Sequence, residues 1–425
     1  MKENEVKAPL ITPIMRWFLF TMVLANIAAE TFSLYVPLYL TELGASIGDV
    51  GFVFTIVSTV ILLLQIVGGW ISDSIGRLKA IAIGSIGGIL GYIAMLLAPT
   101  WQWMLLAIII SRFPSALIGP SFGAFVAENS TKENRGKVYG ITDTIFQITG
   151  VVGPPLGGLL AGAYGFKRML IVPAVMYTIA AALRIWMAST MRSAHEAPPK
   201  PLSWTSFRST LKTMFVLILG GGVLSWILIT DGVRDIAFRL SSELEPIYLE
   251  RVGGISVEQI GLLGSTFSIA MMFTPILSGR IADRFGERVP ISIGFGLVSL
   301  GYFTLLQSEV YLGFVLAWVI FGIGVGLLSP AYQSLISKVV PKDLLGTFTG
   351  LFRSSLGLIS LPAPWVGAQL WERFSPRLPF SLTALVSLLT IIPTWFKFKL
   401  PSSPEAEFLD SKTEISPLSS DDDLV

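Results

Sequence analysis

The chain carries one unusual sequence twice, 210 residues apart. The copies read Gly69-Trp-Ile-Ser-Asp73-Ser-Ile-Gly76-Arg77 and Gly279-Arg-Ile-Ala-Asp283-Arg284-Phe-Gly286-Glu. Each copy lies in a short charged break between two long apolar segments. A constant offset of about half the chain indicates that one structural unit has been used twice. The chain is therefore expected to fold as two related halves.

The repeat extends well beyond this loop. A Pro-x-Tyr-Leu segment at 37–40 recurs at 246–249, one residue out of step. Other prolines and glycines recur at the same offset of 210: Pro120, Gly136, Gly140, Pro154 and Gly157 correspond to Pro330, Gly346, Gly350, Pro364 and Gly367. We interpret the chain as two copies of one membrane domain.

The composition supports a membrane protein independently. Hydrophobic residues make up 52% of the chain and charged residues 14%, against about a quarter charged in a typical soluble protein. So much apolar surface requires lipid as its solvent. The net charge of +2 is dispersed over the loops, so no nucleic-acid partner is expected. The absence of cysteine and the single histidine, His195 in a polar segment, predict no metal site and no cofactor.

Twelve apolar segments are long enough to span a bilayer, for which about 20 residues suffice. They run roughly over 17–41, 49–72, 79–98, 101–127, 137–163, 168–190, 222–249, 256–280, 289–307, 310–338, 343–371 and 378–397. We predict an all-α polytopic membrane protein with 12 transmembrane helices, arranged as two six-helix bundles related by a pseudo-twofold axis.

The polar segments between and after the apolar ones define the domains. The predicted N-terminal bundle covers 1–190 and the C-terminal bundle 222–400, joined by a linker at 191–221 with an interfacial helix and followed by a disordered tail at 401–425. Lys and Arg are concentrated in the loops on one side, which the positive-inside rule assigns to the cytoplasm. We therefore expect a multi-pass monomer in the cell (inner or plasma) membrane with both termini cytoplasmic.

With these loops the chain resembles the major facilitator superfamily of secondary transporters over roughly residues 14–400. The family signature between helices 2 and 3 is Gly-x-x-x-Asp-Arg-x-Gly with basic residues after it. The matching residues are Gly69, Asp73, Gly76 and Arg77 in the first half, and Gly279, Asp283, Arg284, Gly286 and Arg288 in the second. Ser74 replaces the usual arginine in the first copy, and Glu287 interrupts the second. The resemblance implies a cytoplasmic latch that stabilises the outward-open state; the alternative is that these are ordinary topogenic charges.

Helices 4 and 5 carry two further family patterns. Arg112 in helix 4 matches a buried arginine of the family. In helix 5, Gly140, Gly153, Pro154, Gly157 and Gly158 resemble an exporter-associated pattern. Helix 11 keeps Pro364 and Gly367 at the equivalent places, so we favour close helix packing and kinking as the reason for the pattern. A specific link to efflux is the alternative.

Several charges fall within the predicted spans, where each costs about 2.5–3.5 kcal/mol on insertion scales. They are Glu30, Arg112, Asp143, Arg184, Asp231, Arg234, Asp235, Arg239 and Arg353. A water-filled cavity between the halves would accommodate them. The exception is Arg184, which we expect to extend toward the cytoplasmic interface.

The charges of helix 7 share one stripe, because they are spaced three or four residues apart. This spacing predicts the pairs Asp231–Arg234 and Asp235–Arg239, which form either a static ladder or a cavity wall that responds to substrate. The repeat also relates Glu30 to Arg239, and Asp143 to Arg353. Opposite signs at related positions predict attraction across the cavity.

Glu30 is the favoured proton carrier. Burial favours the neutral form of a carboxyl and a nearby arginine favours the charged form, so movement of a neighbour can load and unload a proton. Arg112 is the expected partner by the resemblance, and Asp143 and Asp235 are the second choices. The candidate substrate-binding residues are Asp231, Arg234, Arg239, Arg353, Tyr35, Phe122, Tyr332 and Gln333.

These features favour a secondary active transporter that works by rocker-switch alternating access. Proton-coupled efflux (antiport) of organic or amphipathic small molecules is the leading expectation, with protons, a small-molecule substrate and the lipid bilayer as partners. Import of an organic anion or other polar nutrient is the alternative, because five arginines at membrane depth can bind a carboxylate or phosphate. A transport-inactive sensor or scaffold is a third possibility. An enzyme is not expected, since the sequence has no nucleophile elbow, HExxH motif or Walker lysine.

Overall fold

The computed structural model describes residues 12–75, 77–128, 134–190, 223–340 and 356–399, with the side chains of 65–75, 116, 120, 123–124, 127–128, 135 and 223–224 excepted. The expected linker at 191–221, the tail at 401–425 and His195 lie outside these residues. So does the part of the expected span 343–371 that precedes residue 356.

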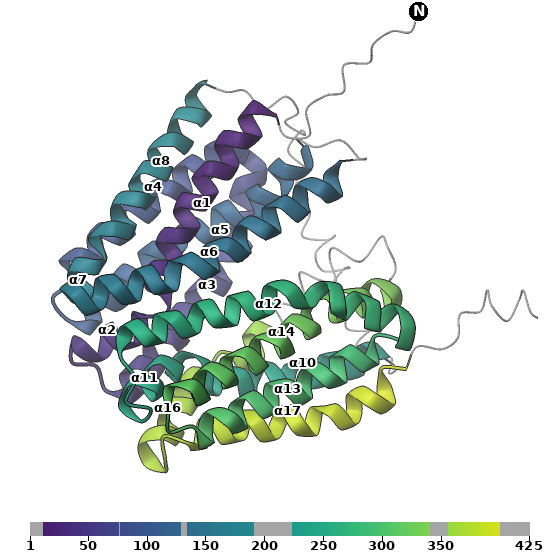
Figure 1. Cartoon of the computed structure of the whole chain (residues 1–425). Helices are drawn as coiled ribbons and strands as arrows, with labels where there is room; N and C mark the ends of the chain where they lie inside the picture. Colours follow the sequence, from purple (N-terminus) through teal and green to yellow (C-terminus); the bar gives the residue numbers. More distant parts are fainter. Residues whose placement is uncertain (1–11, 76, 129–133, 191–222, 341–355, 400–425) are drawn as a thin grey trace, which may run out of the picture.

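The described chain is helical and falls into two groups of helices (Figure 1). The first group is α1 (Pro13–Ser33), α2 (Val36–Glu42), α3 (Ile47–Ile75), α4 (Arg77–Leu97), α5 (Trp101–Glu128), α6 (Arg135–Tyr164), α7 (Phe166–Met169) and α8 (Ile171–Thr190). The second group is α10 (Val223–Ser241), η1 (Ser242–Leu244), α11 (Glu245–Arg251), α12 (Val257–Phe285), α13 (Arg288–Gln307), α14 (Tyr311–Val339), α16 (Ala363–Arg373) and α17 (Leu378–Lys397). Within the described residues, ten segments are long and apolar enough to cross a membrane.

The first span of each half is broken, which the sequence interpretation did not foresee. We expected continuous helices over 17–41 and 222–249, but α1 ends at Ser33 and α2 begins at Val36, and α10 gives way to the 3₁₀ turn η1 before α11. Pro37 and Pro246 follow these breaks at related positions of the repeat. Proline has no N–H to donate and its ring clashes with the carbonyl four residues earlier, so the helix is interrupted just before it.

The two halves have the same internal packing. In the N-terminal half α1 packs on α6 and α8, and α4 packs on α5 and α8. In the C-terminal half α10 packs on α16 and α17, and α13 packs on α14 and α17. The interface between the halves has the same symmetry. α6 packs on α12, and their repeat equivalents α16 and α3 pack on each other. The fold is therefore that of 12 transmembrane helices in two bundles related by a pseudo-twofold axis.

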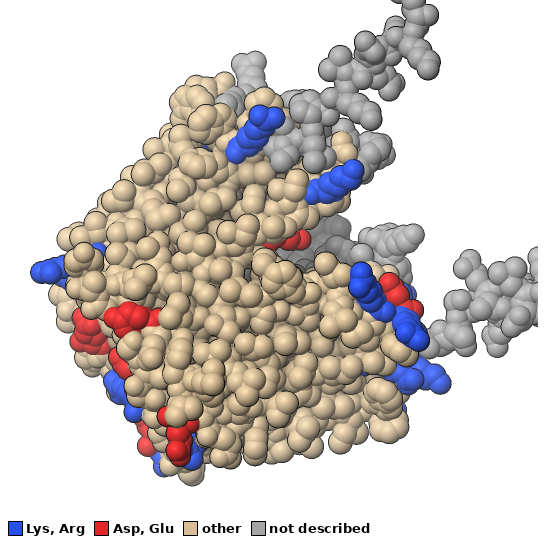
Figure 2. Space-filling model, viewed as in Figure 1, with Lys and Arg blue, Asp and Glu red and all other residues tan. Residues whose placement is uncertain are grey.

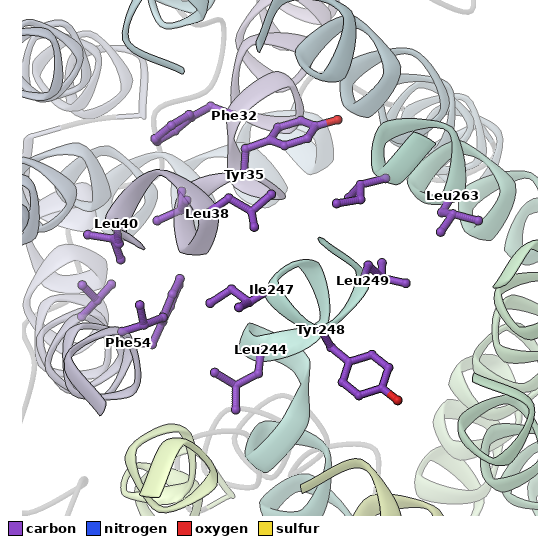
Figure 3. Close-up of a cluster of buried hydrophobic side chains, with 14 of the residues drawn as sticks. Phe32, Tyr35, Leu38, Leu40, Phe54, Leu244, Ile247, Tyr248, Leu249 and Leu263 are labelled. Carbon is purple, nitrogen blue, oxygen red and sulfur yellow. The ribbon is translucent and has the colours of Figure 1, made fainter. Parts of the chain in front are cut away.

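The halves meet at one end and diverge at the other. They separate toward the end where α1 begins and α17 finishes (Figure 1), and Figure 2 shows a notch between them at that end with an acidic side chain inside it. At the closed end, side chains of both halves form one apolar cluster (Figure 3). Phe32, Tyr35 and Leu38 of the first half and Ile247 and Leu249 of the second are each at most 4% exposed. Close packing of this kind holds helices together where lipid surrounds them.

The outer surface is suited to lipid. Large apolar side chains are exposed on many helices, including Leu63, Leu159, Phe273 and Ile276 at 60–69%. On the face seen in Figure 2, charged side chains gather at the two ends and leave an uncharged band between them. Exposing this apolar surface to water would be unfavourable, whereas the hydrocarbon of a bilayer solvates it.

Candidate functional site

A cavity of about 340 Å³ lies inside the N-terminal half, between α1, α4, α5 and α8, with α2 and α6 at its sides. Its volume is within the range of about 300–1,000 Å³ typical of small-molecule sites. Phe32, Tyr92 and Phe122 give it an aromatic wall, and Asn26 and Ser111 add polar groups. We expected a cavity with walls from both halves, but the described residues that line this one all belong to the first half.

Arg112 of α5 and Glu30 of α1 lie near each other beside the cavity. The Arg112 side chain is exposed and lines the cavity. The half-buried Glu30 carboxylate accepts a long hydrogen bond of 3.5 Å from the Ser33 hydroxyl. Arg112 acts electrostatically on Glu30, but the described residues show no ion pair within 4 Å between them. The expected partnership is therefore a through-space attraction in this conformation.

The expectation for Arg184 was wrong. Its guanidinium does not extend to the interface, since the residue is 3% exposed and lines the cavity. Nε donates to Thr21 Oγ1 at 3.2 Å, Nη1 to Ser85 Oγ at 3.2 Å, and Nη2 to the Thr21 carbonyl at 3.3 Å and Met22 Sδ at 3.0 Å. The acceptors that surround the guanidinium come from α1 and α4. The periodicity of the sequence could not predict this hydrogen-bonded group, because its members come from three separate helices.

The charges of helix 7 pair along α10. Arg234 Nη2 lies 2.6 Å from Asp231 Oδ1, and Arg239 Nε lies 3.0 Å from Asp235 Oδ2. The Arg234 guanidinium also lies over the Tyr332 ring, 5.9 Å from its centroid. Arg239 is thus engaged locally and forms no ion pair with its repeat partner in the first half. Arg353, the expected partner of Asp143, lies outside the described residues.

Two acids at the start of the second part of helix 7 were missed. The Glu245 carboxylate accepts a hydrogen bond of 2.7 Å from the Tyr302 hydroxyl. Glu243 is within electrostatic range of Arg112 in the opposite half and of Arg239 in its own. Their position directly before Pro246, inside an otherwise apolar segment, was the available signal.

The remaining candidate substrate contacts differ in their surroundings. Phe122 lines the cavity. Tyr35 is fully buried and its hydroxyl donates to a main-chain carbonyl of α6 at 2.5 Å, while Tyr332 is buried beneath Arg234. Gln333 and Asp143 are exposed. Tyr35 and Tyr332 are placed to hold helices together, which leaves Phe122 as the aromatic candidate at the cavity.

The glycines of α6 mark where other helices come closest. A Cβ on Gly153 or Gly157 would overlap the main chain of α1, and one on Gly158 would lie 2.9 Å from the Val257 carbonyl oxygen of α12. On α16, a Cβ at Gly367 would overlap a main-chain carbonyl of α10, the equivalent contact of the second half. Pro154 packs against α12 and Pro364 against α3.

Gly140 does not share this property. Among the described residues a Cβ added there would meet no atom within 4 Å, so the described neighbours give Gly140 no packing role. The reason is its place near the start of α6, where the halves have diverged.

Hydrogen bonds cross between the halves along both seams. At the seam of α3 and α16, the Gly48 N–H donates to Glu372 Oε1 at 2.7 Å. At the seam of α6 and α12, the Ser265 hydroxyl donates to the Val151 carbonyl at 2.5 Å and the Ser268 hydroxyl to the Gly150 carbonyl at 3.0 Å. The first of these caps the N-terminus of α3 with a carboxylate, a favourable arrangement for the helix dipole.

The duplicated loop is described fully only in its second copy. Gly69, Asp73 and Gly76 lie outside the described side chains, and Arg77 begins α4. In the second copy Asp283 and Arg284 are exposed, and Gly279 has open space around it. Gly286 turns the chain with a φ of +83°, a conformation that glycine adopts without strain. The Arg288 guanidinium lies 5.0 Å from the centroid of the Trp395 ring.

Glu287, which interrupts the family pattern, is the most firmly held residue of this loop. It is 4% exposed, forms an ion pair with Lys338 and accepts a hydrogen bond of 2.9 Å from the Ser334 hydroxyl. Burial acts to raise the pKa of the Glu287 carboxyl, but the bonds from Lys338 and Ser334 outweigh it and hold that pKa below its ordinary value. The loop is thus tied to α14 of its own half.

Comparison with known proteins agrees with this architecture. The family model described as Major Facilitator Superfamily matches residues 18–242 and 236–421, nearly the whole chain. The chain belongs to the Major Facilitator Superfamily. Major facilitator proteins are transporters, and the chain is accordingly a membrane transporter.

Named relatives within the Major Facilitator Superfamily include a "Multi-drug resistance efflux pump PmrA homolog" of Lactococcus lactis, 25% identical over 86% of this chain and 90% of the relative. The "Multidrug resistance protein MdtG" of Escherichia fergusonii is 24% identical over 87% and 91%. A solved POT family transporter in complex with 5-aminolevulinic acid superposes with a TM-score of 0.71 at 16% identity, covering 89% of this chain and 94% of that one. This last likeness concerns the fold alone.

Proposed function

We propose that the protein is a proton-coupled exporter of amphipathic organic small molecules that works by rocker-switch alternating access. The observation that carries this proposal is the cavity beside Glu30, whose aromatic wall and few polar groups suit amphipathic compounds. Relatives matched over most of their length are named as multidrug efflux or resistance proteins. We further propose that both termini are cytoplasmic, so that the notch opens to the cytoplasm, and that residues 1–190 and 222–400 are the two moving units.

The way in which the halves are joined supports the proposal of alternating access. Along the two seams, α6 with α12 and α3 with α16, the contacts are main-chain approaches at glycines and a few hydrogen bonds, which two rigid bundles can exchange without repacking their interiors. Closing the notch would bring the start of α6 and the end of α12 together. It would separate the end of α6 from the start of α12. A solute in the cavity would then be exposed to the opposite side of the membrane.

We assign proton coupling to Glu30 because α6, which packs against it, also contacts α12 of the other half. A Cβ at Gly153 of α6 would overlap Glu30, and Gly158 on the same helix touches α12 across the seam. Neutralising Glu30 changes its attraction to Arg112, and α6 provides a continuous path from this change to the seam. Asp143 and Asp235 are the alternative carriers.

Import of an organic anion is the second candidate, supported by the two arginines at the cavity. Purified protein in liposomes with an imposed pH gradient distinguishes the two. Export predicts that labelled amphipathic compounds move against the proton gradient, that they provoke counter-movement of protons, and that Glu30→Gln abolishes this exchange. The exposed Glu309 provides the matched control, because Glu309→Gln should transport normally. Unchanged exchange in Glu30→Gln would overturn the assignment of the carrier, and solute moving with protons would overturn export.

A further inference from the structure

The end of the cavity at Met22 and Arg184 holds a positive charge without a carboxylate to balance it. Arg184 is 3% exposed, and the acceptors of its hydrogen bonds are hydroxyls, a carbonyl and a thioether, all of them neutral. Arg112 is the second charged residue of the lining. Among the described residues that line the cavity there is no aspartate or glutamate. The Arg184 end of the cavity therefore has a positive potential, and low polarity around a charge strengthens such a potential.

A buried donor stands beside the guanidinium. The Tyr177 hydroxyl lies close to the Ser85 hydroxyl and the Arg184 guanidinium, but neither contact reaches full hydrogen-bonding geometry. Gly88 of α4 makes room for it, since any Cβ there would overlap the phenol. The four bonds of Arg184 also leave one N–H of Nη1 without a described acceptor. A guanidinium N–H and a phenol O–H beside a buried positive charge are donors from which an oxyanion can accept hydrogen bonds.

The rest of the cavity is apolar. Met22, Tyr92 and Phe122 also line it, and side chains of this kind bind flat apolar groups. Glu30 is remote from the Arg184 end, because Met22 contacts Arg184 and Glu30 is eight residues farther along α1. At a rise of 1.5 Å per residue this separation is about 12 Å. An anion at Arg184 therefore leaves the proton site free.

We propose that the cavity binds an amphipathic organic anion, an aromatic carboxylate or sulfonate, with its head group at Arg184 and Tyr177 and its rings against Tyr92 and Phe122. This names the substrate class of the transport proposed above, and it rests on that proposal. A cationic compound of the same shape would meet two guanidiniums and no carboxylate on the cavity wall.

The test measures binding of a matched pair of probes to the full chain in nanodiscs of uncharged lipid. Labelled 1-naphthylacetate and 1-naphthylmethylammonium have the same rings and opposite charge. We expect the anion to bind at least about tenfold more tightly than the cation. Equal affinities, or tighter binding of the cation, would overturn the proposal.

Two substitutions locate the head group. Tyr177→Phe removes one hydroxyl that has no favourable partner, so the fold should persist while anion affinity falls about fivefold to tenfold. Tyr39→Phe is its control, because the Tyr39 hydroxyl is also buried without a partner but lies in α2, away from the cavity lining. Arg184→Gln should lower anion affinity more than thirtyfold. If both cavity variants bind the anion as the wild type does, Arg184 is only a structural tie between α1, α4 and α8.

The failure of this inference can be separated from failure of the proposed function. Selective anion binding without pH-driven movement in liposomes would retain the site and refute proton-coupled export. Export driven by a pH gradient with no preference for the anion would retain the function and refute the substrate class.

Discussion

Glycine-to-alanine substitutions along α6 give the sharpest test of the packing. A Cβ at Gly157 would overlap the Thr31 carbonyl oxygen and stand 2.5 Å from Cε2 of Tyr35. Since ordinary contact begins near 3.4 Å and a main-chain oxygen cannot rotate away, α1 and α6 must separate by roughly 1 Å. A gap of that size forfeits about a quarter to a half of the dispersion attraction of the atoms along it. Overpacking of this kind typically costs about 1–3 kcal/mol.

Gly140→Ala is the matched control on the same helix. Both substitutions gain the same helix propensity, about 1 kcal/mol, but the added Cβ at Gly140 meets no atom of the described residues within 4 Å. We therefore expect Gly157→Ala to be less stable than Gly140→Ala by about 1–3 kcal/mol, measured by denaturant unfolding in detergent and followed by tryptophan fluorescence. Gly367→Ala should resemble Gly157→Ala, because it makes the equivalent contact of the second half. Equal stability of the three variants would refute the reasoning.

Three further predictions concern charges. Glu372→Gln weakens the bond that caps α3 and should cost about 0.5–1 kcal/mol, which would show as a twofold to fivefold larger population open at that seam in spin-label distance distributions. The pKa of the Glu287 carboxyl is lowered in the folded protein, so its ionised form stabilises the fold. This stabilisation is fully present above the ordinary carboxyl pKa and is lost as the pH falls through the lowered pKa. Glu287→Gln should accordingly melt below the wild type at pH 7 and together with it at about pH 3, and Lys338→Met should melt lower at pH 7 as well. Arg234→Met leaves Asp231 buried and unpaired and should cost about 3–5 kcal/mol, whereas adding Asp231→Asn should restore most of the melting temperature.

Local features of the fold were predictable from the sequence. The repeat and the apolar segments predicted the twelve spans and the two bundles, because most of the helices are long and strongly apolar. The spacing of Asp231, Arg234, Asp235 and Arg239 gave the pairs on α10, since partners three or four residues apart meet on any helix.

Features that depend on three separate helices were not predictable. Arg184 was misplaced because the residues that bury it are distant in sequence. The cavity was expected between the halves for the same reason, since no periodicity shows which faces of α1, α4 and α5 leave space. Glu287 looked like a departure from a motif and proved to be held by Lys338 on α14. Gly140 and Gly157 look alike in sequence, and only their neighbours distinguish them.

The central claim is that the two halves rock about each other as solute and proton exchange. The chain has no cysteine, so pairs of spin labels can be introduced without removing native thiols. One pair at Lys137 and Arg280 would report the diverging ends of α6 and α12, and a second at Glu42 and Arg251 would report the closed end. The account predicts that lowering the pH or adding a transported compound shortens the first distance and lengthens the second. Distances that both stay constant, or that change in the same direction, would contradict it.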